Sequence, residues 1–340
     1  MKLGILNGGG DCAGLNAVIR AVVRKSEQFG YEVIGIRHGW AGLLDLDTVP
    51  LTWRDVSQII SQGGTILHTT RTNPFSRKDG AGTVLANVEK LGLDALVAVG
   101  GEDTLSVAAK LSSMGLKVVG VPKTIDNDIV ATDMTFGFDT AVNVTVEAID
   151  RIQTTGESHD RIMVVEVMGR HAGWIAAYAG IASGASLILV PEEPINLDEV
   201  AAFLKKRHDS GATASIVVVG EGCIFKGYPT ATTTKADEFG HVRLGGIGDL
   251  LARELEKRVG IETRAVVLGH VVRGGAPSAY DRILATRLAV AAVQSIKDGE
   301  FGIMVRVQGN TVSKVPLSDI VGKMKNLDKE TLSIVKDFSV

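Results

Sequence analysis

The chain has 340 residues, of which 45% are hydrophobic, and its formal net charge is −3. This length suffices for one large or two medium-sized domains. The nearly balanced charge disfavours a nucleic-acid-binding protein with a broad basic face, but a few local arginines are enough to bind a small anion.

Short apolar runs alternate with helical patterns along most of the chain. The runs predict strands at Lys2–Leu6, Glu32–Arg37, Ala95–Val99, Val118–Val121, Ile162–Val167, Leu187–Val190, Ile216–Val219, Ala265–Leu268 and Ile303–Val307. Helices are predicted at Leu15–Phe29, Val56–Gln62, Val84–Leu91, Leu105–Ser113, Ala141–Thr154, Leu197–Lys206, Leu250–Arg258 and Arg282–Ile296. This alternation predicts an α/β protein with mostly parallel sheets that helices cover on both faces.

Three other stretches depart from this simple alternation. Residues 172–191 carry no charge over a length that can span a bilayer, but a helix at Trp174–Ile181 followed by a buried strand explains them better. The Thr-rich stretch Tyr228–His241 is predicted to be an exposed loop or hairpin, and the amphipathic tail from Pro316 a terminal helix.

The two cysteines, Cys12 and Cys223, form neither a CxxC pair nor a metal-ligand spacing. We therefore expect a reducing compartment and a cytoplasmic location.

Glycines and acids follow the first and third predicted strands. Gly8–Asp11 is a glycine-rich turn that can bring backbone N–H groups to a phosphate, although it fits neither the P-loop nor the GxGxxG pattern. In Gly100–Thr104, Glu102 is a candidate Mg²⁺ ligand. The structural alternative is that Asp103 or Thr104 caps the helix that follows.

The most informative segment, Pro122–Asp128, follows the fourth predicted strand. The carboxyl ends of strands in open α/β sheets face the ligand crevice. Asp126 can accept a hydroxyl proton there while Thr124 and Asp128 orient it. An Asx-rich turn is the alternative, but two aspartates around an asparagine exceed what a turn requires.

Arginines mark other strand ends. Met168–Gly173 presents Arg170 after the strand Ile162–Val167, whereas Arg161 precedes the same strand. Since six residues of strand span roughly 20 Å, both arginines do not serve one site from one chain, and Arg161 is either a surface residue or reaches a neighbouring subunit. Arg264 and His270–Gly275 bracket a later strand and suit an anion, and Glu221 is placed to bond a sugar hydroxyl.

Taken in chain order, these segments resemble the phosphofructokinase family, whose members transfer a phosphoryl group to the 1-hydroxyl of fructose 6-phosphate. The match is carried by Gly8–Asp11, Gly100–Thr104, Pro122–Asp128, Arg161, Met168–Gly173, Glu221, Arg264 and His270–Gly275, over about residues 1–310. The resemblance implies two three-layer α/β/α domains with discontinuous boundaries. The first would comprise 1–138 with 250–300 and bind the donor, and the second 139–249 with 301–340 and bind the sugar phosphate.

The resemblance also implies residue roles. Asp126 would be the catalytic base, aided by Lys123, Asp103 and Arg170. The sugar phosphate would be bound by Thr124, Asp128, Met168, Gly169, Arg170, Glu221, His270 and Arg273, joined by Arg161 and Arg264 from a neighbouring subunit of a homodimer or homotetramer. Gly9, Gly10, Arg71, Asp103 and Lys123 would bind the donor, and Glu102 would bind Mg²⁺.

Two residues bear on the phosphoryl donor. Family members that use ATP commonly have glycines where this chain has Asp103 and Lys123, so the chain resembles the pyrophosphate-dependent branch. A carboxylate at position 103 would repel the α-phosphate of ATP, and Lys123 can neutralise the leaving phosphate. The expected activity is reversible, Mg²⁺-dependent phosphoryl transfer from pyrophosphate to fructose 6-phosphate. The alternatives are an ATP-dependent enzyme, another acceptor such as sedoheptulose 7-phosphate, and a phosphate sensor without catalysis.

Overall fold

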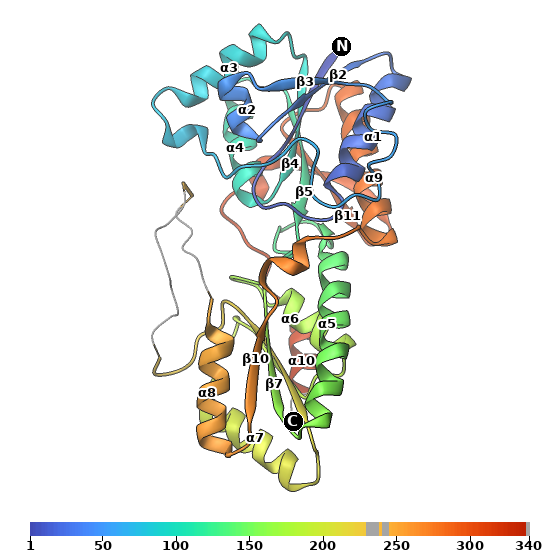
Figure 1. Cartoon of the computed structure of the whole chain (residues 1–340). Helices are drawn as coiled ribbons and strands as arrows, with labels where there is room; N and C mark the ends of the chain where they lie inside the picture. The colour runs from blue at the N-terminus through green and yellow to red at the C-terminus, as the bar shows by residue number, and fades with distance from the viewer. Residues whose placement is uncertain (229–237, 240–244, 338–340) are drawn as a thin grey trace.

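The computed structural model describes residues 1–228, 238–239 and 245–337, which form two α/β domains stacked end to end (Figure 1). In the first domain the strands run in the order β12 (Thr311–Pro316), β11 (Ile303–Gln308), β5 (Val118–Thr124), β4 (Ala95–Gly100), β1 (Lys2–Asn7), β2 (Glu32–Ile36) and β3 (Thr48–Leu51), with β6 (Phe136–Gly137) beside β5. The second sheet has the order β10 (Thr263–Val267), β7 (Ile162–Val167), β9 (Ser215–Gly220) and β8 (Leu187–Leu189). The pairings of these strands are parallel except β2–β3 and β11–β12, in agreement with the predicted fold class.

Helices cover both faces of each sheet. In the first domain α1 (Leu15–Gln28) and α9 (Ala279–Lys297) lie together on one face, and α2 (Trp40–Asp45), α3 (Gly80–Lys90) and α4 (Glu102–Ser113) lie on the other (Figure 1). In the second, α5 (Phe138–Ser158) and α6 (Trp174–Ala182) oppose α7 (Leu197–Asp209) and α8 (Ile247–Val259). The terminal helix α10 (Lys329–Asp337) packs on α6.

The alternation of strand side chains divides the apolar core between these layers. In β4, Val97 joins the cluster under α1 and α9, whereas Leu96 joins the cluster under α4. In β7, Val165 faces α5 and α6 while Val164 faces α7 and α8. Burying each such side chain contributes roughly 1.5–3 kcal/mol, which is why strands covered on both faces are apolar at every position.

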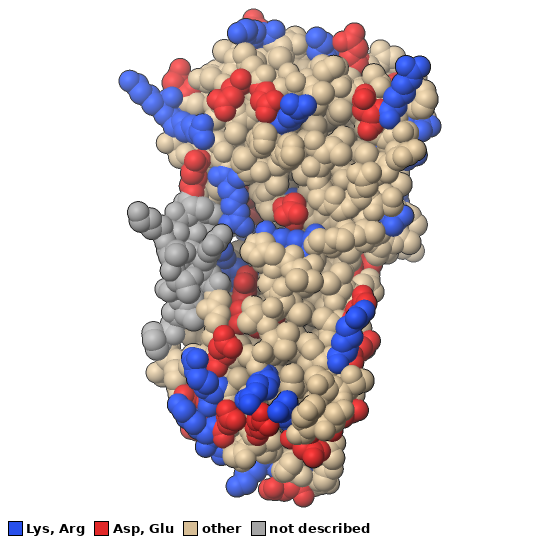
Figure 2. Space-filling model, in the orientation of Figure 1, with Lys and Arg blue, Asp and Glu red and all other residues tan. Residues whose placement is uncertain are grey.

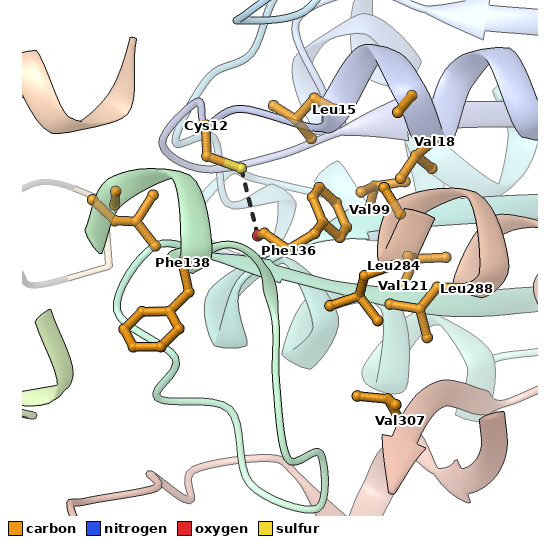
Figure 3. Close-up of a cluster of buried hydrophobic side chains, with 14 of the residues drawn as sticks. Cys12, Leu15, Val18, Val99, Val121, Phe136, Phe138, Leu284, Leu288 and Val307 are labelled. Carbon is orange, nitrogen blue, oxygen red and sulfur yellow. Dashed lines mark hydrogen bonds between the residues drawn. The ribbon is translucent and has the colours of Figure 1, made fainter. Parts of the chain in front are cut away.

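One apolar cluster continues from the first domain into the second. Phe136 and Phe138 flank Gly137 where β6 leads into α5, and the Cys12 thiol lies 3.8 Å from the Phe136 carbonyl oxygen (Figure 3). Gly137 has φ +98°, and a Cβ there would lie 2.6 Å from the Cys12 Sγ. The left-handed backbone and the close approach of Cys12 therefore favour glycine at this junction between the domains.

Most predicted elements are present, but one helix is absent and one is shorter than predicted. The tail from Pro316 forms a 3-10 turn at Leu317–Asp319 and becomes helical only in α10. Residues 53–58 form successive turns in place of the helix predicted at Val56–Gln62. The backbone bonds from Asp55 to Thr52 and from Gln62 to Ile59 span three residues, and Val56 and Ile59 are buried without a helix. The pattern also missed the short elements α2, β3 and β12. Residues 172–191 form α6 and β8 as expected, and most of Tyr228–His241 lies outside the described residues.

The sheets also correct the predicted domain boundaries. Within 250–300, β10 pairs with β7 of the second sheet, while α9 packs on the first domain. Within 301–340, β11 and β12 belong to the first sheet, and α10 belongs with the second domain. A strand's own sequence does not reveal its sheet, because its partners are distant in the chain.

None of the described helices is both long and apolar enough to cross a membrane.

Candidate active site

The carboxyl ends of the central strands of the first sheet open into a cavity of about 310 Å³. Such a volume suits a small ligand. Figure 2 shows acidic and basic side chains gathered in the hollow where the two domains meet. The cavity is lined by Gly9, Gly10, Asp11, Arg71, Gly101, Glu102, Asp103, Thr104, Lys123, Thr124, Ile125, Asp126, Asp128, Arg170, His171, Glu221, Arg273, Gly322, Lys323 and Met324.

The glycine turn after β1 forms one wall of this cavity. Thr69 donates its hydroxyl to the Gly9 carbonyl oxygen at 2.7 Å, and the Gly9 N–H donates to the Thr70 carbonyl. A Cβ at Gly10 would lie 3.0 Å from the Arg273 guanidinium. The absence of a side chain therefore lets a cation from the segment after β10 approach the turn.

Lys123 lies at the end of β5, almost fully buried. Its ammonium donates to the Gly10 carbonyl oxygen at 2.6 Å, and burial lowers its pKa. A buried cation beside a glycine turn is stabilised by any anion that enters, because the anion offsets the lost hydration.

Asp126 lies two residues beyond β5 in a tight turn. Its backbone N–H donates to the Thr124 hydroxyl at 3.0 Å, and the Asn127 side chain accepts from the Thr135 N–H at 3.1 Å. These bonds hold Asn127 at φ +49° and direct the flanking aspartates into the cavity.

Electrostatics favour the neutral form of Asp126. Burial, and next the charge of Asp128, raise its pKa to about 7, and its buried Oδ1 has no hydrogen-bond partner among the described residues. Burial also raises the pKa of Asp128. A carboxyl group with a pKa near neutrality suits a general base, since it can both take up and release a proton.

Glu102 and Asp103 lie in the first turn of α4. The helix begins at Glu102, and the residue at its N-cap is Gly101, which has no side chain, so the alternative in which Asp103 or Thr104 caps the helix is wrong. Acids in the first turn are instead favoured by the helix dipole. Glu102 Oε1 accepts from the Ser106 hydroxyl at 2.5 Å and from the Gly322 N–H at 2.8 Å.

These contacts orient Glu102 in a way that fits Mg²⁺. Among the described residues no three His, Cys, Asp or Glu side chains gather to hold a metal by themselves. Mg²⁺, however, commonly uses one or two carboxylates together with substrate phosphates and water. Glu102, fixed at Oε1 and lining the cavity, meets that requirement.

The second domain contributes Arg170, after β7, and Glu221, after β9. Burial is the main cause that raises the pKa of Glu221. The Gly222 N–H donates to the Gly169 carbonyl at 3.2 Å, and a Cβ at Gly222 would lie 1.9 Å from the Arg170 carbonyl oxygen. The two strand ends thus pack closely enough to place a cation and an acid side by side.

Comparisons with known proteins place the chain in a family. Residues 2–296 match the family model described as phosphofructokinase. The chain belongs to the phosphofructokinase family. It is 53% identical to the pyrophosphate--fructose 6-phosphate 1-phosphotransferase of Amycolatopsis methanolica over 97% of both chains. It is also 50% identical to ATP-dependent 6-phosphofructokinase 3 of Streptomyces coelicolor over 96% of both.

A solved structure supports the same assignment. Phosphofructokinase from Pichia pastoris superposes with a TM-score of 0.83 at 32% identity, covering 99% of this chain and 36% of the longer yeast chain. Since relatives of both donor types lie near 50% identity, overall similarity does not decide the phosphoryl donor of this phosphofructokinase.

Some predicted site residues lie outside the cavity. Met168 and Gly169 precede Arg170 but do not line the cavity, and neither does His270, which lies in the 3-10 helix Gly269–Arg273. Arg161 and Arg264 lie at the opposite end of the second sheet, as the strand-length argument requires, and both pair with Glu262.

Sequence reasoning also missed residues that line the cavity. Asp11 and His171 line the cavity and belong to the segments Gly8–Asp11 and Met168–Gly173, so their place in these segments was the available signal. Gly322, Lys323 and Met324 lie in the tail that was predicted to be helical from Pro316, but α10 begins only at Lys329, and an amphipathic pattern does not reveal that they line the cavity.

Proposed function

We propose that this phosphofructokinase transfers a phosphoryl group reversibly from pyrophosphate to the 1-hydroxyl of fructose 6-phosphate, giving fructose 1,6-bisphosphate, with Mg²⁺ as cofactor. The observation that carries the choice of donor is that Asp103 and Lys123 both line the cavity beside the glycine turn. The similarity to the Amycolatopsis enzyme over nearly the whole chain supports it.

The donor choice follows from charge. Asp103 adds a carboxylate at the N-terminus of α4, where its negative charge would repel the extra phosphate of ATP. Lys123 already contacts the turn that would hold the donor and can balance charge on the departing phosphate. Phosphoryl transfer asks a protein mainly for positioning and electrostatics, so two residues suffice to change the donor.

The proposed chemistry begins at Asp126. Its carboxylate takes the proton from O1 of fructose 6-phosphate while O1 bonds to the nearer phosphorus of pyrophosphate. The bond from that phosphorus to the bridging oxygen breaks, and inorganic phosphate leaves beside Lys123. Mg²⁺, held by Glu102, would supply neutralising charge to the phosphate oxygens. Thr124 and Asp128 position the sugar hydroxyl.

The sugar phosphate lies against the second domain in this proposal. Arg170, Glu221 and Arg273 line the cavity and would bind the sugar phosphate together with Met168, Gly169 and His270. Arg161 and Arg264 would complete the site of a neighbouring subunit, which requires at least a dimer. We further propose that the enzyme works in the cytoplasm.

A turnover assay tests the proposal. Protein, fructose 6-phosphate, Mg²⁺ and pyrophosphate should yield fructose 1,6-bisphosphate in a coupled assay. The Asp126→Ser variant should lose turnover but bind fructose 6-phosphate with nearly unchanged affinity in calorimetry. Unchanged turnover in Asp126→Ser would refute the mechanism, and binding without turnover in the wild type would favour a sensor. Faster turnover of sedoheptulose 7-phosphate would reassign the acceptor.

A further inference from the structure

A segment near the C-terminus crosses the active-site cavity. This strap, defined as residues 320–327, lies beyond the residues that match the family model, 2–296. Three of its residues nevertheless line the cavity, namely Gly322, Lys323 and Met324. The strap connects the first sheet, which ends with β12, to α10 on the second domain.

Hydrogen bonds fix the strap to both acid-bearing segments of the site. The Gly322 N–H donates to Glu102 at 2.8 Å, and the Lys325 N–H donates to the Asp128 carbonyl at 2.8 Å. The Lys325 ammonium donates to two further carbonyls of the turn after Asp128, and the Trp174 indole donates to the Lys325 carbonyl at 3.0 Å. The strap is therefore an ordered wall of the cavity.

Lys323 lies between Gly322 and Lys325, the two residues whose N–H groups bond to Glu102 and Asp128. Its backbone N–H donates to the Ile320 carbonyl, whereas its side chain makes no hydrogen bond or ion pair within the described ranges 1–228, 238–239 and 245–337. The side chain is exposed and borders the cavity next to the Gly322–Glu102 contact. Lys323 therefore brings a cation to the cavity wall one residue from the contact with Glu102.

The charges around the cavity give this cation a role. The lining contains six carboxylates, Asp11, Glu102, Asp103, Asp126, Asp128 and Glu221, and five cations, Arg71, Lys123, Arg170, Arg273 and Lys323. Such a lining does not attract a polyanion unless cations gather where it binds. Lys123 is held against Gly10, and Arg170 belongs to the second domain. Arg273 lies near Gly10, and Arg71 also lines the cavity. Lys323 directly follows Gly322, whose N–H donates to Glu102.

Resting on the proposed function, we infer that Lys323 is a donor-binding residue. Its ammonium pairs with a terminal phosphate oxygen of pyrophosphate on the Glu102 side of the cavity, and it retains that contact as inorganic phosphate leaves. The strap thereby adds to the donor site a charge from outside the family-matched region. Its flexible stem suits a point contact with phosphate.

Substitution of Lys323 tests the inference against a matched control. Lys323→Ala should raise the KM for pyrophosphate about tenfold, as expected for loss of a charge-assisted contact. The KM for fructose 6-phosphate should stay within about twofold. Lys323→Arg should restore most of the affinity. Lys329→Ala removes an exposed lysine of the same tail outside the cavity and should change neither constant.

Calorimetry of pyrophosphate with Mg²⁺ and no acceptor separates this inference from the proposed function, because it needs no turnover. Weaker pyrophosphate binding in Lys323→Ala supports the inference even if the acceptor assignment fails. Unchanged binding and unchanged KM for pyrophosphate would overturn it. An increase confined to the KM for fructose 6-phosphate would also overturn it, since Lys323 would then face the acceptor.

Discussion

Replacing the proposed base with its neutral isostere should inactivate the enzyme and stabilise the fold. The pKa of Asp126 is raised from 3.8 to about 7, by burial first and then by Asp128. A difference of about three units corresponds to roughly 4 kcal/mol of destabilisation when the group is ionised. Because Asp126 is half-buried and lines the cavity, water solvates part of the carboxylate, and we expect about 2 kcal/mol for Asp126→Asn.

The sign of the pH dependence follows from this shift. Below the unfolded pKa the group is protonated in both states and has no effect. Between pH 4 and 7 the folded state holds a proton that the unfolded state has lost, so the penalty grows as pH rises and is complete above the folded pKa. Asp126→Asn should therefore gain most stability above pH 7 and little at pH 4.

Thermal unfolding of the free protein measures the effect. For 340 residues, 2 kcal/mol corresponds to a rise in Tm of about 3 °C at pH 8. Turnover should fall by about 10²–10⁴-fold. The exposed Asp209, at the end of α7, provides a control, since Asp209→Asn should change neither quantity. A Tm at pH 8 that is unchanged or lowered in Asp126→Asn would refute the electrostatic argument.

Two further predictions concern the same site. In the wild type, kcat/KM should fall as pH drops below about 7, because Asp126 must be ionised to take a proton. Asp128→Asn removes a neighbouring negative charge and should shift this fall in kcat/KM about one pH unit lower. If the fall stays at the same pH, another group titrates. Arg161→Ala should raise the KM for fructose 6-phosphate by roughly 10–100-fold if it acts across subunits. Mixing Arg161→Ala with Asp126→Ser subunits should then recover roughly a quarter of wild-type activity, since hybrid dimers contain one intact site. If Arg161→Ala lowers activity but mixing recovers none, Arg161 does not act across subunits.

Strands that are buried on both faces were predictable from the sequence, because their residues form continuous apolar runs. The strand Ile162–Val167 was predicted with its observed bounds, because every residue is buried and most are aliphatic or β-branched. The helix predicted at Val56–Gln62 was wrong, because a few apolar residues in successive turns can be spaced like those of a helix. β3, a four-residue strand at the sheet edge that contains Pro50, was missed because proline is unusual in strands.

The candidate site was predictable in part for a similar reason. Asp126 and Lys123 follow an unmistakable strand, and parallel strands bring their carboxyl ends together. Strand length alone separated Arg161 from Arg170. The strap could not be predicted, because its contact between Gly322 and Glu102 joins residues 220 apart in the sequence and depends on tertiary packing.

The most direct test of the proposed donor compares pyrophosphate with ATP in the wild type and in an Asp103→Gly, Lys123→Gly double variant. Each protein receives fructose 6-phosphate and Mg²⁺, and fructose 1,6-bisphosphate is followed by a coupled assay. We predict that wild-type kcat/KM for pyrophosphate exceeds that for ATP by at least about 100-fold and that the double variant shifts this ratio toward ATP by a similar factor. Wild-type turnover with ATP equal to or above that with pyrophosphate would contradict the assignment of Asp103 and Lys123.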